Sequence, residues 1–295
     1  MTKTTKLVGR EPGSAPPGKI KGLIYGPAGV GKTWFATSFP KPYYHDTEGG
    51  ADLAHYQDRL KAAGGSYLGP PDGTLDFEFI IGQAQALATE THPWQTVIYD
   101  SLTKLWGTTI LNAQETLGDK DVFGASKKPA IRQMRRLLNW VQRLDMNCWF
   151  VAHEVAEWGV INGQRQEIGR GPDCWDKIPY ELHLCLRAEK RGNSRVATVK
   201  KSRLLGFPEG ETFELDYAEF AKRYGKDFIE AAPKPIVLAS EDQVNEIHRL
   251  LSVVKVPAEE AEKILAKAGA ESWAELNEEQ ASKTIQWLLK KISGK

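Results

Sequence analysis

The sequence lacks any continuous apolar stretch of about eighteen residues, so it does not predict a membrane-spanning helix. Residues 1–18 are polar and rich in Lys, Thr, Gly and Pro, which does not fit a secretory leader with a charged segment before an apolar one. We therefore expect a cytoplasmic protein with no membrane partner, and we expect residues 1–18 to form a flexible arm.

Cysteine is scarce, and charge of one sign does not dominate. The three cysteines, Cys148, Cys174 and Cys185, are odd in number and widely spaced, which excludes a disulfide framework or a zinc site of ordinary spacing. The formal net charge is only +1, so any binding to nucleic acid must depend on local basic patches. With 295 residues, 41% of them hydrophobic, the chain can form a core and about two domains.

Apolar runs and helical stretches alternate from residue 20 to about residue 228. This alternation predicts an α/β fold with a mostly parallel central sheet flanked by helices. The expected strands are residues 19–25, 42–46, 96–100, 148–152, 182–188 and 195–200.

The alternation stops at a Pro- and Ala-rich break, which predicts a second unit. Ser240 with Gln243 and Asn277 with Gln280 are spaced as capping boxes, and they indicate a small all-α bundle. In that bundle, Trp273 and Trp287 fit helical cores better than a binding site. The expected organisation is an arm (1–18), a core (19–230), a linker (231–237) and a helical domain (238–295).

The strongest motif follows the first expected strand. Gly26-Pro27-Ala28-Gly29-Val30-Gly31-Lys32-Thr33 matches the phosphate-binding pattern G-x-x-x-x-G-K-[ST] without a mismatch, and a helix is expected after it. In such a loop the backbone N–H groups converge on phosphates, the lysine reaches the β/γ oxygens and the threonine hydroxyl binds Mg²⁺. The alternative is a chance match in a glycine-rich turn. The motif predicts ATP and Mg²⁺ as cofactors.

Asp100 ends the apolar strand at residues 96–100. In phosphate-loop NTPases an aspartate at the end of the strand beside the phosphate loop holds Mg²⁺, so we expect Thr33 and Asp100 to form the metal site. The alternative is that Asp100 is an ordinary turn residue.

The segment Asp46-Thr47-Glu48-Gly49 follows the second expected strand and resembles the D-T-E-G segment of the RecA and RadA recombinases. The resemblance implies that Glu48 is the general base that activates water, and that Asp46 orients it. It covers residues 19 to about 215. An acidic turn ending in glycine is the alternative.

Residues 148–154 resemble the strand that carries the γ-phosphate sensor of this family. The sensor is usually glutamine, but here the position holds His153, which could donate a hydrogen bond to phosphate or water or could instead cap or pack the strand end. The A-H-E sequence at this point, with the two preceding motifs, is similar to the phage ATPases of the Sak type. Those RecA-like proteins are associated with single-strand annealing and recombination.

The resemblance also implies an oligomer. RecA-like and replicative-helicase subunits carry a K-x-R or K-x-K pair that reaches the ATP of a neighbouring subunit, and Lys201 and Arg203 have this spacing. They are expected to act in trans within a homo-oligomer. A solvated basic strand end is the alternative.

The resemblance further implies that two segments, residues 118–129 and 154–172, are the loops that line the DNA groove in RecA relatives. Cations with an interspersed aromatic suit single-stranded DNA, because phosphates are neutralised while bases stack. Both segments also contain acidic residues, so each could be a solvated face. The candidate DNA-binding residues are Lys127, Lys128, Arg132, Trp158, Arg165 and Arg170.

These features predict an ATP-hydrolysing, single-strand-DNA-binding protein of phage recombination or annealing. A single-strand-binding protein or another recombination protein is a further expected partner. The main alternative is a phosphate-loop ATPase that acts on a protein partner, such as a helicase loader, and a third is a nucleotide-dependent switch without DNA contact.

Overall fold

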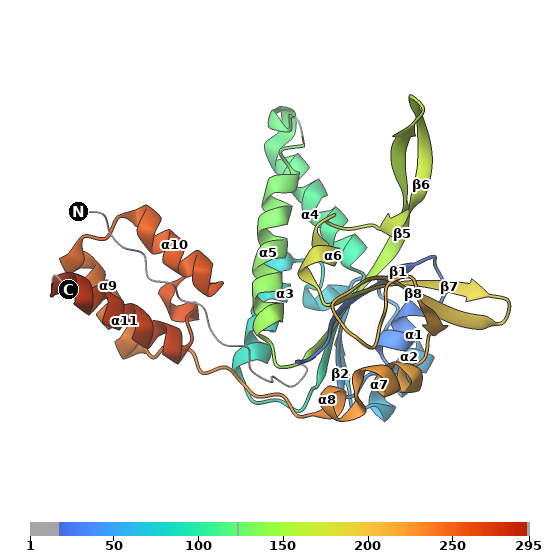
Figure 1. Cartoon of the computed structure of the whole chain (residues 1–295), viewed down its shortest axis with the longest axis horizontal. Helices are drawn as coiled ribbons and strands as arrows, with labels where there is room; N and C mark the ends of the chain where they lie inside the picture. Colours follow the sequence, from blue (N-terminus) through green and yellow to red (C-terminus); the bar gives the residue numbers. More distant parts are fainter. Residues whose placement is uncertain (1–17, 123, 294–295) are drawn as a thin grey trace.

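The computed structural model describes residues 18–122 and 124–293 (Figure 1). The arm expected at residues 1–18 lies outside this range except for its last residue. The described chain has an α/β core with a mostly parallel sheet flanked by helices, followed by C-terminal helices. The predicted fold class is confirmed.

One twisted sheet organises the core, in the order β3-β2-β4-β5-β1-β7-β8-β9. The strands from β3 to β7 are parallel, while β8 and β9 are antiparallel, and β6 pairs only with the outer part of β5. The strand bounds are β1 (Lys21–Gly26), β2 (Pro42–Asp46), β3 (Ser66–Leu68), β4 (Thr96–Asp100), β5 (Asn147–Ile161), β6 (Gln164–Pro172), β7 (Leu184–Arg191), β8 (Ser194–Ser202) and β9 (Thr212–Glu214).

Helices cover both faces of this sheet, and three more form the C-terminal bundle. Their bounds are α1 (Lys32–Ala36), α2 (Ala54–Ala62), α3 (Phe77–Thr89), α4 (Leu102–Leu117), α5 (Lys127–Arg143), α6 (Ile178–Glu181), α7 (Tyr217–Tyr224), α8 (Lys226–Glu230), α9 (Glu241–Val254), α10 (Ala258–Ala268) and α11 (Glu278–Ile292). Among the described residues, three short 3₁₀ turns lie between these elements: Pro70–Asp72, Gly118–Lys120 and Trp273–Glu275.

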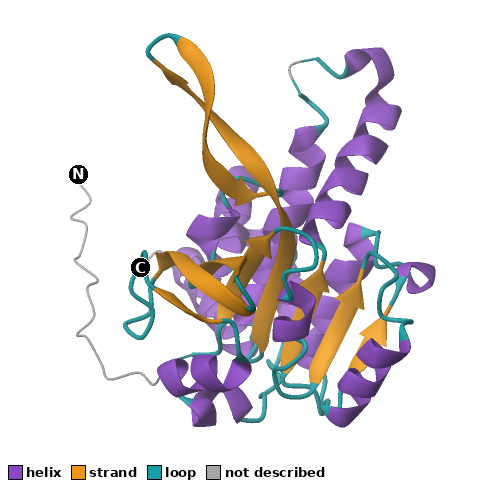
Figure 2. Cartoon of the chain, turned by 90° about the vertical axis from the view of Figure 1, so that its right-hand side faces the viewer, coloured by secondary structure: helices purple, strands orange, loops and turns teal. Residues whose placement is uncertain are grey.

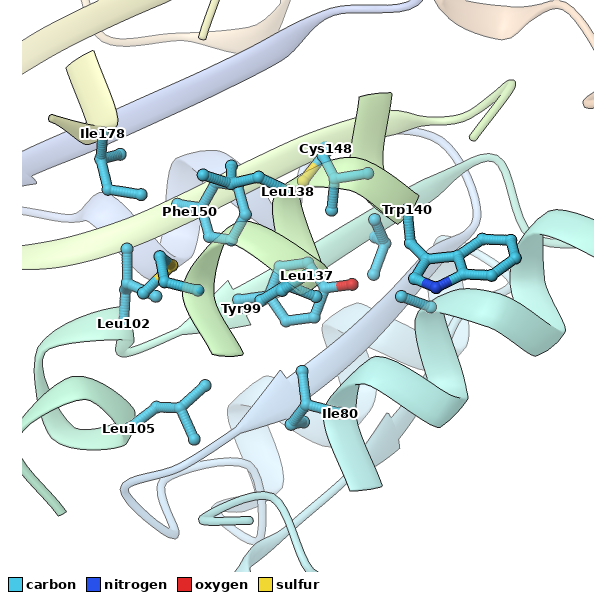
Figure 3. Packing of buried hydrophobic residues seen from close by; sticks show 14 of the residues in the cluster. Ile80, Tyr99, Leu102, Leu105, Leu137, Leu138, Trp140, Cys148, Phe150 and Ile178 are labelled. Atoms are coloured by element: carbon cyan, nitrogen blue, oxygen red, sulfur yellow. The ribbon is translucent and has the colours of Figure 1, made fainter. Parts of the chain in front are cut away.

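Alternating side chains of the buried strands serve two separate cores. On β5, Cys148 and Phe150 face the cluster formed with α3, α4 and α5, while Trp149 and Val151 face the cluster formed with α1, α2 and α7. Figure 3 shows the first cluster, in which Tyr99 and Phe150 stack with ring centroids 5.0 Å apart. Because β5 is buried on both faces, its inner half reads as a continuous apolar run.

The predicted strands agree with the structure at β2 and β4, the other four differ in their bounds, and the short strands β3 and β9 were not predicted. Residues 154–172, expected as a loop, form a long antiparallel hairpin of β5 and β6 that stands away from the sheet (Figures 1 and 2). The loop expected at residues 118–129 is shortened, because α5 already begins at Lys127. The sequence does not predict this hairpin, because the β6 strand, QRQEIGRGP, has little apolar alternation.

The C-terminal helices have a core of their own, which includes Trp273 and Trp287 as expected from their spacing. Both capping boxes form, and α10 runs between Pro257 and Gly269. The bundle meets α5 of the core through few polar contacts: Arg136 Nε lies 2.8 Å from Glu271 Oε2, and Arg143 donates to the carbonyl of Glu275 over 2.8 Å.

Candidate functional site

The glycine loop lies at the carboxyl end of β1, between β1 and α1. Gly29 and Gly31 have φ angles of +72° and +97°, which L side chains rarely adopt, and nothing lies within 4 Å of a Cβ built on Gly29. The loop therefore borders open space, a pocket of about 390 Å³ that Lys32 and Thr33 also line. Because the two glycines have no side chains, the loop leaves room for a phosphate chain.

Lys32 lies inside the loop with 8% of its surface exposed. Its ammonium donates to the carbonyls of Gly26 and Pro27, each over 2.9 Å. Burial lowers its pKa, while the negative charges of Asp100 and Glu48 act in the opposite direction. Lys32 is thus held at the pocket by weak carbonyl acceptors, which an anion can replace.

Thr33 and Asp100 meet as the metal-site prediction requires. The Thr33 hydroxyl donates to Asp100 Oδ2 over 2.5 Å. Asp100 is buried, and this burial raises its pKa to about 6; the hydrogen bond from Thr33 acts against the rise and the charge of Glu48 adds to it. A buried carboxylate next to a hydroxyl is an oxygen donor set suited to Mg²⁺.

Asp100 does not lie on the strand next to β1, because β5 is inserted between β1 and β4. Asp100 still reaches Thr33, since the carboxyl ends of these parallel strands converge on one edge. The described residues contain no group of three or more His, Cys, Asp or Glu side chains placed to hold a metal ion. A cation here would take its remaining ligands from phosphate and water.

Glu48 and His153, more than one hundred residues apart in sequence, lie in contact. His153 Nε2 lies 2.8 Å from Glu48 Oε1, and the Ser101 hydroxyl donates to the same oxygen over 2.7 Å. Among the described residues, none donates to Oε2 of Glu48. This carboxylate is therefore oriented through one oxygen and retains a second that can accept a proton.

Asp46 holds the backbone that carries Glu48. Its carboxylate accepts from the backbone N–H groups of Glu48 and Gly49, over 2.8 and 3.0 Å, and of Ala51, over 2.6 Å. Thr47 and Ser101 add two reciprocal hydrogen bonds between this turn and the end of β4. The turn that presents Glu48 is thus fixed to both neighbouring strands.

Three residues that line the pocket were not predicted from the sequence: Trp34, Tyr56 and Arg195. Trp34 follows the motif and contacts Tyr56 of α2 edge to face, with ring centroids 6.3 Å apart. Arg195 comes from the start of β8, 164 positions after Gly31. No local pattern marks it, because only the pairing of β7 with β1 brings it to the loop.

Lys201 and Arg203 lie at the other end of β8. Ser202 pairs with Leu184, which itself pairs with Gly22 at the start of β1, so this end is remote from the glycine loop of the same chain. Lys201 donates to the carbonyl of Leu182, and Arg203 donates to that of Tyr180 over 2.5 Å. Their action on a neighbouring subunit stays a prediction.

The candidate DNA-binding residues lie on two projections. Lys127, Lys128 and Arg132 are exposed on the first turns of α5. On the hairpin, Trp158 is 54% exposed, and Arg165 lies over its ring at 5.3 Å. Arg170, in contrast, pairs with Glu167 over 2.8 Å. Figures 1 and 2 both show the hairpin and the α4–α5 end projecting from the same side of the molecule.

No described helix is both long and apolar enough to span a membrane. A comparison with curated proteins finds no match. A family model described as an AAA domain matches residues 18–205, which is more than half of the chain and includes the glycine loop, Glu48, Asp100 and His153. These proteins are nucleotide-binding ATPases of the phosphate-loop class. The chain belongs to the AAA domain family.

Proposed function

We propose that this protein is a Mg²⁺-dependent ATPase that binds single-stranded DNA in phage homologous recombination or single-strand annealing. The observation that carries the proposal is the position of His153. This residue contacts Glu48, and it is also the point where β5 leaves the sheet to form the projecting hairpin. His153 therefore connects the proposed site of hydrolysis with the proposed DNA surface along one strand.

Each residue of the pocket has a distinct task in this proposal. Lys32 exchanges its carbonyl acceptors for phosphate oxygens, and Thr33 and Asp100 hold Mg²⁺, which supplies charge neutralisation at the phosphates when bound. Glu48 accepts a proton from water at its unoccupied oxygen, while Ser101 and His153 fix its orientation. His153 can also report on a bound phosphate by changing this contact.

The proposed DNA surface comprises the exposed cations at the start of α5 and the hairpin. Lys127, Lys128 and Arg132 supply positive charge, and Trp158 with Arg165 supplies a stacking surface. In a homo-oligomer, Lys201 and Arg203 would complete the transition-state charge in the neighbouring subunit. That exchange requires them to leave the carbonyls that they contact in the single chain.

ATP turnover measured with and without single-stranded DNA, together with the oligomer mass in each state, tests the proposal. We expect DNA to accelerate turnover and DNA binding to fall steeply as salt increases. A matched variant with Lys127, Lys128 and Arg132 changed to Ala should lose stimulation but keep its basal rate. If DNA neither binds nor stimulates, the DNA assignment is wrong while the ATPase assignment stands.

One observation favours a second candidate, an ATPase that acts on a protein partner in replication, as a helicase loader does. Residues 154–172 contain three Glu and only two Arg, and several large apolar side chains are exposed there. These are Val155, Trp158, Val160, Ile161 and Ile168. Stimulation by a protein partner without any effect of DNA would support this second function.

A further inference from the structure

Arg195 lies over the glycine loop although the two are remote in sequence. β7 pairs with β1 in parallel, with Arg187 opposite Tyr25, and β8 returns so that Arg195 lies opposite Lys190. A Cβ built on Gly31 would lie 3.0 Å from Cδ and 3.3 Å from Nε of Arg195. The start of β8 therefore forms one wall of the phosphate pocket.

Among the described residues, the guanidinium of Arg195 has no partner, unlike the two other arginines of the β7–β8 hairpin. Arg187 pairs with Glu154 over 3.1 Å, and Arg191 pairs with Glu189. Across the ranges 18–122 and 124–293, no carboxylate pairs with Arg195 and no acceptor takes a hydrogen bond from its side chain. An exposed, unpaired arginine beside open space is available for an anion.

We propose that Arg195 binds the phosphate chain of the nucleotide held by its own subunit. This inference rests on the proposed nucleotide binding at the glycine loop. The planar guanidinium offers several N–H donors in a fixed fork, which suits phosphate oxygens better than a lysine does. Lys32 and Arg195 would then approach the phosphates from two sides, Lys32 from within the loop and Arg195 from the hairpin.

This position distinguishes Arg195 from the basic pair on the same strand. Lys201 and Arg203 lie at the end of β8 that is remote from the loop, so they do not reach the nucleotide pocket of their own chain. Arg195 acts within one chain and needs no assembly. Its contribution is therefore measurable on the isolated subunit as nucleotide affinity, independently of turnover.

The test compares the affinity of ATP and ADP for the full chain by titration calorimetry with Mg²⁺, in the Glu48→Gln background to prevent hydrolysis. Arg195→Ala should raise the Kd of both nucleotides about tenfold. Arg195→Lys should recover part of the loss, because it restores charge without the fork. Arg191→Ala, at the same hairpin end but paired with Glu189, is the matched control and should bind normally.

The outcomes separate this inference from the function on which it rests. If the Glu48→Gln parent binds ATP and the Arg195→Ala variant binds it equally well, the proposed role of Arg195 is wrong and the nucleotide site stands. If no variant binds any nucleotide, the proposed function fails and this inference fails with it. Equal melting temperatures of the variants would establish that a loss of affinity is not a loss of folding.

Discussion

Asp100→Asn should stabilise the nucleotide-free protein while lowering its affinity for Mg²⁺. Burial raises the pKa of Asp100 from 3.8 to about 6, so the ionised carboxylate is disfavoured in the folded state. A difference of two pKa units corresponds to about 3 kcal/mol in the free energy of unfolding. Asparagine keeps an oxygen that can accept from Thr33 and removes the buried charge.

The stabilisation by Asp100→Asn should depend on pH in a defined direction. Between pH 3.8 and about 6 the folded protein binds the proton more tightly than the unfolded chain, so the contribution of Asp100 to stability falls as pH rises. Below this window the carboxyl is protonated in both states and the substitution should be nearly neutral. Above it, the full gain of about 3 kcal/mol should appear.

Urea unfolding in EDTA at pH 4 and pH 8 measures this difference. Asp46→Asn is the matched control, because Asp46 is also buried and lies opposite Asp100 in the β2–β4 ladder, yet accepts three backbone N–H groups. Asp46→Asn should lower stability, since one amide oxygen cannot replace two carboxylate oxygens. If Asp100→Asn were destabilising at pH 8, the account of Asp100 as a charge whose burial outweighs its hydrogen bond from Thr33 would be refuted.

Three further substitutions test the pocket. Lys32→Ala should abolish hydrolysis or weaken nucleotide binding in a turnover and binding assay, because the charge at the phosphates is lost; unchanged turnover would contradict the site. Glu48→Gln should keep ATP binding but lower the hydrolysis rate by about two to four orders of magnitude, whereas an unchanged rate would leave Glu48 as a turn residue. Lys201→Ala with Arg203→Ala should bind ATP but not hydrolyse it, with Lys200→Ala as the control, and mixing with Lys32→Ala subunits should restore part of the activity. If subunits exchange and no activity returns, the trans role is wrong.

The sequence predicted those parts of the site that depend on local patterns. The glycine loop and the ends of β2 and β4 are each encoded by a short contiguous segment, and the contact between Thr33 and Asp100 follows from the common edge of parallel strands. Arg195 could not be found in this way, because its position depends on the register of two ladders.

The strand structure of the projecting hairpin could not be predicted from its own sequence. Its residues were identified as a segment, but polar residues on both faces of β6 hid the strand. Strand pairing there is fixed by its partner β5 rather than by its own burial. His153, the partner of Glu48, is expected from the sequence as a phosphate sensor or as a residue that caps or packs the strand end, and nothing in residues 148–154 indicates that it contacts a carboxylate.

The continuity of β5 has a mechanical consequence. Residues 148–151 pair with β1 on one side and with β4 on the other, and Ala152 and His153 pair with β1, so this half cannot bend without breaking ladder hydrogen bonds. The only irregularity in its pairing with β6 lies between Glu157 and Trp158, four residues beyond His153. Because the regular pairing is interrupted there, we expect the hairpin to bend at residues 157–158, while the contact between His153 and Glu48 stays fixed by the inner half of the strand.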